Sequence, residues 1–579
     1  MMKYMENLPR KGLILLFVVL CHMGPGQIFA QPTVSFSVQS GFYDKPFPLA
    51  LTMPEAAEGQ EYVIRYTLNG SQPQKSSPAY SQPIMLDERS FSPSNIYRIQ
   101  NAPDELWHCP ERVDRIVVVR AAVFGKSGER CSEVATASYV ITSLLGRSIS
   151  LPVVSLCVDS ADLFDYQHGI FVPGASFDPA DIEKTGNYYR SGKASERMAH
   201  FEFMDGDDLV AQDCGLRTHG NISRRYAQKG MSLYARQSYG KKNFKGIWLG
   251  SKDKRLVLRP FSSAWTPAGF QNYFCQMLAS SVNLHFDNLA CKPVAVFLNG
   301  EYWGIYFLEQ KPDEKYVAKK QGVDSKSVRL VEDWAGHDDD GIDSSFVELM
   351  QWVAATDFSD NQAYEELSQR IDIESFVDYV VFETFIGNRD WPANNMRCWS
   401  VDGSPWRFIF FDGDAIRTTR FDAVGNAMSC DSSVSWPASP ESTLLLRKLL
   451  VNKRFRHKFR TRMNELCENH FQWSVFGVGE CLSPLFGVVV NDLEREISAQ
   501  SARFSYPKGV RAWKANVRQL RRYFKRRAAV VQREWERRLD ELDGRPSSMG
   551  IPIILSALLA LIALSTIAVR RCRRRLRGR

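Results

Sequence analysis

Hydrophobic positions are spaced differently in the two halves of this 579-residue chain. Between residues 32 and 142, short apolar runs separated by turn residues recur, among them VIRYTLNGSQP, IVVVRAAVF and ATASYVI. Short strands at regular intervals, without long helical periods, are typical of a small β-sandwich. We therefore predict a β-sandwich domain at residues 31–145.

Strands also begin the next part of the chain, and helices follow them. ISLPVVSLCV, AHFEFMD, MSLYAR and RLVLRPF have the composition of strands, and AVFLNGEYWGIYFLEQ predicts a hairpin that turns at Asn299-Gly300. Helical spacing dominates from Ser344, in SSFVELMQWVAA and IESFVDYVVFETFIG, and it continues to Leu542. Strands first and helices later predict an α+β body with two lobes at residues 150–542.

Both ends of the chain carry apolar segments. Residues 1–30 place basic residues before a short apolar run and a helix-breaking Gly-Pro-Gly, which predicts a secretory signal peptide. Residues 549–569 form an uncharged apolar stretch long enough to span a bilayer, between a linker at 543–548 and an Arg-rich tail at 570–579. By the positive-inside rule, we predict one C-terminal transmembrane helix with a cytoplasmic tail. The body is then secreted, membrane-anchored and extracytoplasmic, in the cell envelope.

The formal net charge of +8 is concentrated at the C-terminus. Seven of the last ten residues are Arg, so the rest of the chain carries a net charge of only +1. Nucleic-acid-binding domains have a basic face of their own. The sequence therefore argues against nucleic acid as a partner.

Several common kinds of site are excluded by missing motifs. The body contains ten Cys between Cys109 and Cys481, and none form a CxxC pair, so zinc ribbons and thioredoxin-type redox sites are not indicated. Cys109 and Cys131 are one candidate disulfide, but connectivity cannot be read from sequence. There is no HExxH, no GxSxG and no P-loop, and no GxGxxG opens a helix after a strand.

Acidic and amide side chains in the second lobe follow an order that suggests phosphoryl transfer. Asp390 is followed five positions later by Asn395, and the strand-like run FIFF then delivers Asp412 and Asp414. A kinase needs a base for the acceptor hydroxyl and hard oxygen ligands for Mg²⁺. We interpret Asp390 as the base, and we interpret the other three as metal ligands. Each motif alone also fits an ordinary turn, so the interpretation depends on their order.

A cation that holds phosphate is expected earlier, on a strand of the first lobe. The candidate is Lys229, which precedes the strand-like MSLYAR. Glu309, at the end of the strand YWGIYFL, is the carboxylate that could fix this Lys. These two residues are the predicted nucleotide-binding pair.

Together these segments resemble the CotH kinase family, named after a bacterial spore coat protein and related to atypical protein kinases. The resemblance covers residues 150–542 and rests on HGNISRRYAQKGMSLYAR, VFLNGEYWGIYFLEQK, IDIESFVDYVVFETFIGNRDWPANN and WRFIFFDGD. It implies an atypical kinase that uses ATP with Mg²⁺ or Mn²⁺. The roles it assigns are ATP-phosphate contact for Lys229, the catalytic Asp for Asp390, and metal binding for Asn395 with Asp412 or Asp414.

The chain departs from the family pattern at three places. The family usually has Arg-Gly-Asn where this chain has His-Gly-Asn at 219–221. After the strand ending LVLR, Asn272 stands near the position where an acid is expected. Ala415 follows Asp414, where Gly or Phe is common. These departures bear on activity rather than on fold.

The predicted β-sandwich has a resemblance of its own. Residues 66–80 and 132–139 are similar to the domain at the C-terminal end of chitobiases and β-hexosaminidases, an immunoglobulin- or fibronectin-like module. The resemblance implies a spacer or an accessory module close to carbohydrate. The expected partners are therefore an envelope or surface protein as substrate, the membrane through the C-terminal helix, and carbohydrate near the β-sandwich.

The main prediction is a kinase that transfers phosphoryl from ATP to a Ser or Thr hydroxyl of a protein. A second hypothesis is a catalytically inactive, surface-displayed binding or structural protein on a kinase-like scaffold, which the altered loops favour. Against it, four polar ligands are costly to keep in a cleft without a metal. A third hypothesis, a carbohydrate hydrolase, needs two carboxylates at a defined separation, which sequence cannot show.

Overall fold

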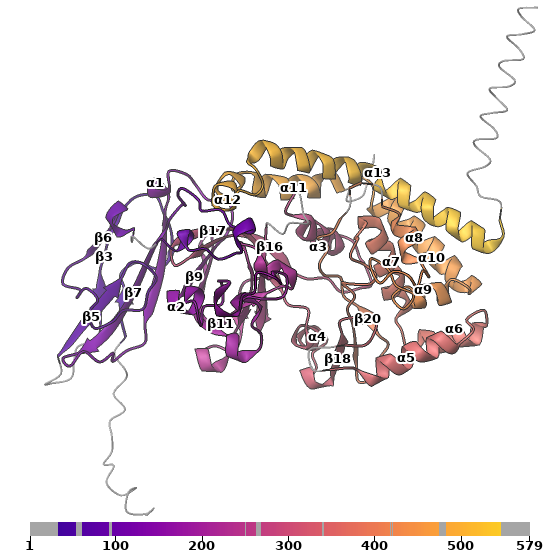
Figure 1. The fold of residues 1–579 in the computed structure, drawn as a ribbon, viewed down its shortest axis with the longest axis horizontal. Coiled ribbons are helices and arrows are strands. Elements are labelled where there is room, and N and C mark those ends of the chain that lie inside the picture. The colour runs from indigo at the N-terminus through magenta and orange to yellow at the C-terminus, as the bar shows by residue number, and fades with distance from the viewer. Residues whose placement is uncertain are drawn as a thin grey trace, which may run out of the picture.

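The computed structural model describes most of the chain between residues 33 and 545. The described ranges are 33–53, 61–91, 95–248, 250–261, 268–337, 341–416, 418–419, 421–473 and 482–545. Small sheets lie at one end of the molecule, a barrel follows them, and a mainly helical part lies at the other end (Figure 1). The long helix α13 (Val510–Asp543) runs along one side of the helical part.

The N-terminal part consists of short strands packed around a core of their own. Its largest sheet has the order β2-β8-β7-β5, and β3-β6 and β1-β4 form two-stranded sheets. The strands are β1 (Ser35–Phe36), β2 (Gly41–Tyr43), β3 (Phe47–Leu49), β4 (Leu51–Thr52), β5 (Tyr62–Thr67), β6 (Ile84–Leu86), β7 (Val117–Gly125) and β8 (Ala135–Ile141), followed by the short helix α1 (Thr142–Leu145). Every residue of β7 is buried, because Val119 and Val123 face this core while Val118 faces the barrel side. Packed sheets therefore occupy the region where a β-sandwich was predicted.

Seven strands close into a barrel in the order β10-β11-β12-β15-β17-β16-β9. Neighbouring strands are antiparallel, except that β16 and β9 run parallel. The strands are β9 (Val153–Val158), β10 (Arg197–Asp205), β11 (Asp208–His219), β12 (Gly230–Tyr234), β15 (Arg255–Pro260), β16 (Cys291–Leu298) and β17 (Glu301–Gln310). β16 and β17 form the hairpin predicted at Asn299-Gly300, whose two turn residues have φ of 49° and 83°, as a type I′ turn requires.

The barrel corrects the predicted fold class. The expected kinase-like α+β body with two lobes is wrong, because the structure has mixed α and β content with a closed barrel in its first half. Closure pairs Val153 of β9 with Ala295 of β16, which are far apart in the sequence. Apolar side chains from all seven strands, such as Leu156 and Leu308, fill the interior. Closure removes the exposed edges that an open sheet would leave. The sequence did not predict it, because local periodicity does not reveal which distant strands will pair.

The membrane part of the prediction is also corrected. No helix within the described ranges has the length and the apolar character needed to cross a bilayer. The predicted transmembrane helix (549–569), its tail (570–579) and the signal peptide (1–30) lie outside those ranges. The predicted membrane-anchored localisation thus finds no support among the described residues.

Helices form most of the remaining structure, with the small sheet β18-β19-β20 beside them. The helices are α2 (Ser160–Phe164), α3 (Gln271–Ser281), α4 (Glu314–Gln321), α5 (Ser344–Ala355), α6 (Asn361–Ser368), α7 (Ile373–Ile386), α8 (Ala423–Ala427), α9 (Leu444–Leu449), α10 (Lys453–Glu465), α11 (Leu482–Glu494) and α12 (Ile497–Phe504). The short strands are β13 (Phe244–Lys245), β14 (Lys252–Asp253), β18 (Val328–Val331), β19 (Cys398–Val401) and β20 (Arg407–Phe408). The helix predicted from SSFVELMQWVAA is α5 with the same bounds, whereas the strand predicted from WRFIFFD is reduced to the two residues of β20.

The described cysteines are all free thiols. No disulfide joins Cys109 to Cys131, so that candidate pair is not formed. Others, such as Cys157, are buried in apolar cores, and burial raises the pKa of the Cys157 thiol to about 12. These cysteines serve as small apolar core residues.

Helix α7 ends where the loop that carries Asp390 begins, and α13 holds that end in place. The last carbonyls of a helix have no partner within the helix. Arg527 of α13 donates from Nε to the carbonyl of Phe385 at 2.8 Å and from Nη2 to that of Thr384 at 2.5 Å. Gly387 then ends α7 with a positive φ of 68°, as is typical of a helix C-terminus. The start of the loop is therefore fixed by a distant segment.

Replacing Arg527 by Met should lower the free energy of unfolding by about 2 kcal/mol, because it leaves buried carbonyls without donors. Urea unfolding followed by tryptophan fluorescence measures the change. Arg526→Met is the matched control, since its side chain is exposed on the same helix, and it should leave the midpoint unchanged. Equal midpoints for Arg527→Met and the wild type would refute this role.

Candidate active site

Asp412 and Asp414 meet at a single guanidinium group. Arg259, near the end of β15, donates from Nη1 to Asp412 Oδ1 at 3.0 Å and to Asp414 Oδ2 at 3.2 Å. The two carboxylates follow β20, whereas β15 belongs to the barrel. The site is therefore built where the barrel meets the helical part.

Glu309, on the neighbouring strand β17, completes this ion cluster. Arg259 Nε donates to Glu309 Oε1 at 3.0 Å, and Asn272 Nδ2 of α3 donates to Oε2 at 3.1 Å. Asn272 Oδ1 accepts from the backbone N–H of Gly413 at 3.0 Å, so one amide links Glu309 to the loop of Asp412 and Asp414. Burial raises the pKa of Glu309, and Arg259 opposes that rise.

Asn395 lies against the same loop. Its Nδ2 donates to the backbone carbonyl of Asp412 at 3.2 Å, and its own carbonyl accepts from the Tyr379 hydroxyl of α7 at 2.9 Å. Asn395 and Asp412 both have a positive φ, of 57° and 56°. Asn and Asp adopt this left-handed conformation more readily than most other residues with a side chain. The two residues thus share a backbone conformation as well as a hydrogen bond.

Asp390 lies in the loop after α7, close enough to Asp412 for their charges to interact. Burial raises the pKa of Asp390 to about 6, and Asp412 adds to that rise. Burial also raises the pKa of Asp414 to about 7; Arg259 opposes that rise, whereas Asp412 and Glu309 add to it. An ordinary Asp titrates at roughly 3.9. The carboxylates of this site thus carry more negative charge than Arg259 compensates, which suits them to bind a cation or to take up a proton.

Glu383, a buried residue of α7, holds the loop of Asp390 in place through Asn388. Its Oε2 accepts from Asn388 Nδ2 at 3.0 Å, and Asn388 Oδ1 accepts from the backbone N–H of Asp390 at 3.2 Å. Burial raises the pKa of Glu383 well above its usual value, and the charges of Asp412 and Asp390 add to the rise. Glu383 is therefore a positioning residue that the sequence analysis missed, because an acid inside an apolar helix gives no motif.

Lys229 does not join this cluster. Its buried Nζ donates to the carbonyls of Arg224 at 2.7 Å and Tyr226 at 3.0 Å, and it lies 4.2 Å from the centroid of the Tyr188 ring. Burial holds the pKa of Lys229 well below its usual value. The predicted pairing of Lys229 with Glu309 is wrong, because Glu309 pairs with Arg259 instead. The contact of Lys229 with a nucleotide phosphate stays a prediction.

His219, at the departure from the family pattern, is a structural residue in this arrangement. Its Nδ1 lies 3.0 Å from Ser232 Oγ. Burial lowers its pKa well below the usual value, and the nearby charge of Arg259 lowers it further. His219 is therefore neutral and hydrogen-bonded at neutral pH.

The central cation, Arg259, was not predicted. A signal was present, because RLVLRP places Arg259 at the end of an apolar strand that reads as buried. A charge in such a strand needs a partner, since buried charges are almost always paired. Asn272 was noted only as a departure, yet it is the residue that joins Glu309 to the aspartate loop.

A divalent cation fits these residues. Within the described ranges, no three or more His, Cys, Asp or Glu side chains are arranged to hold a metal by themselves. Mg²⁺ does not require such a cage, because it is usually bound by one or two carboxylates together with water and phosphate oxygens. Asp412 and Asp414 offer two carboxylates with excess negative charge, and Asn395 lies beside them. The donor set is thus compatible with Mg²⁺ when phosphate supplies further oxygens.

Comparison with protein-family models gives two matches. Residues 216–531 match CotH kinase protein, and residues 52–139 match Fn3 associated. No curated protein matches the chain. The first match covers more than half of the chain and includes every predicted site residue from Lys229 to Asp414. The resemblance inferred from the sequence is thereby confirmed, and the chain belongs to the CotH kinase family.

Proposed function

We propose that this protein transfers the γ-phosphoryl group of ATP to a hydroxyl of a protein, with Mg²⁺ as the cofactor. The observation that carries the proposal is the convergence of Asp412, Asp414 and Asn395 beside Asp390, in a chain that belongs to the CotH kinase family. These are the residue types that phosphoryl transfer requires for metal binding and for orienting the acceptor.

Each residue has a defined task in this proposal. Asp412 and Asp414, with Asn395, would hold Mg²⁺, which when bound neutralises charge on the phosphates. Asp390 orients the acceptor hydroxyl and accepts its proton as the bond from the γ-phosphorus to that oxygen forms. The bond from the γ-phosphorus to the leaving oxygen of ADP breaks in the same transfer. Arg259 offsets the repulsion between the two aspartates and holds them near Glu309.

The rate should depend on pH through Asp390. Its pKa is raised to about 6 by burial and by Asp412. A base must be ionised, so at saturating Mg²⁺, which keeps Asp414 ionised, the rate of transfer should rise with pH through a limb no higher than about pH 6 and then level off. Bound Mg²⁺ would move the limb lower, since a nearby cation favours the carboxylate. Initial rates between pH 4.5 and 8 test this, and a rate that falls over the same range would contradict the assignment of Asp390.

A binding protein without turnover is the second candidate. The observation in its favour is that Arg259 Nη1 already donates hydrogen bonds to both Asp412 and Asp414, the carboxylates that a metal would need. If that guanidinium were the permanent counter-ion, Mg²⁺ would not compete for the two carboxylates. The two candidates therefore differ in whether the protein responds to Mg²⁺ with ATP and in whether it transfers the phosphoryl group.

The test combines thermal stability with labelled transfer. Purified protein is heated with Mg²⁺, with ATP, and with both, and incorporation from γ-labelled ATP into the protein itself or into a mixed protein acceptor is counted. We expect a rise in melting temperature that needs metal and nucleotide together, and labelling that EDTA abolishes. If neither ATP nor Mg²⁺ changes stability, and no label is transferred, the proposal fails and the binding protein remains.

A further inference from the structure

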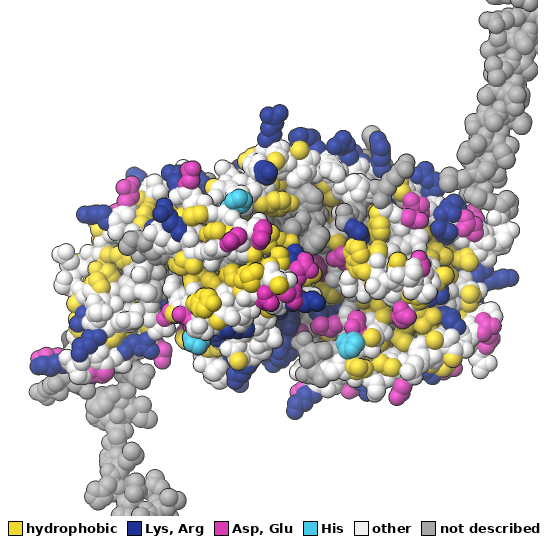
Figure 2. All heavy atoms as spheres, in the orientation of Figure 1, with side chains coloured by type: hydrophobic (Ala, Val, Ile, Leu, Met, Phe, Trp, Pro, Cys, Tyr) yellow, Lys and Arg dark blue, Asp and Glu magenta, His cyan; other side chains and the backbone are white. Residues whose placement is uncertain are grey.

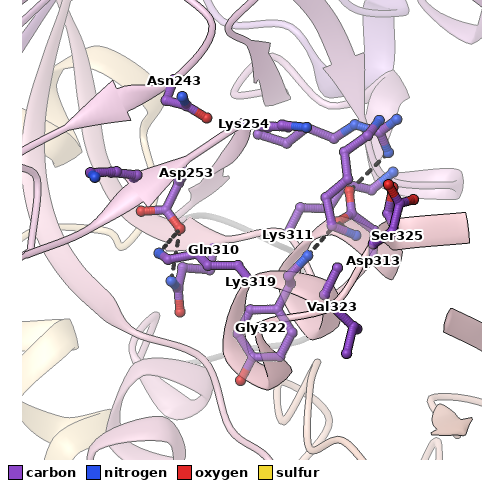
Figure 3. A pocket seen from close by; sticks show the side chains of 16 residues that line it. Asn243, Asp253, Lys254, Gln310, Lys311, Asp313, Lys319, Gly322, Val323 and Ser325 are labelled. Atoms are coloured by element: carbon purple, nitrogen blue, oxygen red, sulfur yellow. Dashed lines mark hydrogen bonds and ion pairs between the residues drawn. The ribbon is translucent and has the colours of Figure 1, made fainter. Parts of the chain in front are cut away.

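A cationic pocket of about 420 Å³ lies at the end of the strand pair β15 and β17, next to helix α4 (Figure 3). Its walls come from the segment β14–β15, from the end of β17, and from α4 with the turn that follows it. Six Lys or Arg side chains line it, against three Asp. The pocket therefore has an excess of three positive charges.

The three carboxylates of the pocket are already engaged. Asp253 Oδ1 accepts from Lys319 Nζ at 2.7 Å and from Gln310 Nε2 at 2.9 Å, and Figure 3 shows both side chains turned toward it. Asp313 Oδ2 accepts from Arg255 at 2.8 Å, while its Oδ1 caps the first turn of α4. Asp324 accepts from the backbone of the turn that it begins.

Several cations of the pocket are not compensated. Lys252, Lys254 and Lys315 have no carboxylate partner among the described residues. Burial lowers the pKa of Lys315; the positive charges of Arg255 and Lys254 lower it further, whereas Asp313 and Glu314 oppose the shift. The lining of the pocket thus carries an excess of positive charge, and Figure 2 shows Lys and Arg side chains scattered over the face that it displays.

The uncompensated cations indicate an anionic ligand. Lys binds phosphate as a point charge, whereas Arg binds carboxylates and phosphates alike through a bidentate fork. The one Arg of the pocket is bound to Asp313, so the uncompensated charges are Lys. Apolar lining is limited to a few side chains, chiefly those of Tyr316 and Val323, which leaves little surface for a hydrophobic ligand.

The pocket shares its strands with the candidate active site. Arg255 and Arg259 are four residues apart on β15, so both leave the same face of the strand. At about 3.3 Å per residue, they are separated by about 13 Å along the strand. A ligand in the pocket would therefore lie about 13 Å along β15 from Arg259, the residue that binds Asp412 and Asp414.

We propose that this pocket binds a phosphate-bearing ligand through Lys252, Lys254 and Lys315, separately from the carboxylate site. The phosphate is carried either by a free polyphosphate, including a nucleotide, or by a phosphorylated side chain of a protein. This binding needs no phosphoryl transfer, so it stands whether or not the protein proves to be an active kinase.

The test measures binding by calorimetry and thermal shift at fixed ionic strength, in EDTA, so that the carboxylate site has no metal with which to hold phosphate. The probes are inorganic phosphate, tripolyphosphate, ADP and a phosphoserine peptide. We expect saturable binding of tripolyphosphate, and at least tenfold weaker binding by the double variant Lys254→Gln Lys315→Gln. The matched control is Lys45→Gln Lys193→Gln, two exposed lysines outside the pocket, which should bind like the wild type.

The probes distinguish the two sources of phosphate. Tighter binding of ADP than of tripolyphosphate identifies a nucleotide, whereas tighter binding of the phosphoserine peptide identifies a phosphorylated protein. Asp414→Asn should keep this binding while losing any transfer, so failure of the pocket and failure of the kinase proposal can be told apart. Absence of saturable binding for all four probes, or equal affinity in the double variant and the wild type, would overturn the proposal.

Discussion

Replacing Asp390 by Asn should reduce the rate of phosphoryl transfer by a factor of about 10² to 10⁴, the range that a positioned general base contributes. Asn has nearly the same shape and keeps a hydrogen-bonding group, but it cannot accept the hydroxyl proton. The buried position and the raised pKa of Asp390 make ionisation more costly than in water. Loss of the charge should therefore preserve the fold while removing proton transfer.

Initial-rate measurements at saturating ATP and Mg²⁺ give this factor. Asp207→Asn is the matched control, because Asp207 is exposed on the turn between β10 and β11, and its rate should equal that of the wild type. Thermal stabilisation by ATP with Mg²⁺ should persist in Asp390→Asn, since Asp412 and Asp414 are unchanged. A variant that binds ATP and transfers phosphoryl at the wild-type rate would show that Asp390 is not the base.

Replacing Arg259 by Met should lower the free energy of unfolding by about 3 kcal/mol at pH 7, the scale for removing one partner of a buried ion cluster. Arg259 pairs with Asp412, Asp414 and Glu309 within 3.2 Å. Met fills similar space, but it leaves three carboxylates facing one another with no positive charge between them. Urea unfolding measures the loss, and exposed Arg518→Met serves as the control.

The loss of unfolding free energy in Arg259→Met, called the deficit below, should increase with pH. Burial already raises the pKa of Asp414 to about 7, and Arg259 restrains that rise. The pKa of Asp414 should therefore be higher in the variant than in the wild type. A carboxyl whose pKa is higher in the folded state than in the unfolded state loses stability as pH rises between the two values. Well below pH 7 Asp414 is protonated in both proteins, so the deficit should be smallest near pH 5 and should grow as pH rises above about 7. A deficit that is constant with pH would mean that packing, rather than charge, is lost.

Local patterns in the sequence were sufficient for several elements. Alternating apolar residues around Asn299-Gly300 predicted the hairpin of β16 and β17, and the helical spacing from Ser344 to Ala355 predicted α5. These elements follow from interactions between residues close in sequence, namely a two-residue turn and one buried helix face. The order Asp390, Asn395, Asp412 and Asp414 likewise indicated the second half of the site before any contact was known.

Long-range pairing decided the rest. Lys229 was the expected partner of Glu309, but β15 pairs with β17, which brings Arg259 across from Phe307 and within reach of Glu309. Lys229 is instead enclosed by backbone carbonyls near Tyr188. A charged residue near a strand looks the same in sequence whichever neighbour that strand acquires.

The sequence by itself thus determined the family, the main helices and the acidic residues of the candidate site other than Glu383. Only the tertiary structure decided the closure of the barrel, the choice of Arg259 as the central cation, and the clustering of Lys252, Lys254 and Lys315 in one pocket. The physical reason is that hydrophobic periodicity specifies which face of each element is buried, whereas charges are matched across elements that lie side by side only after the strands have paired.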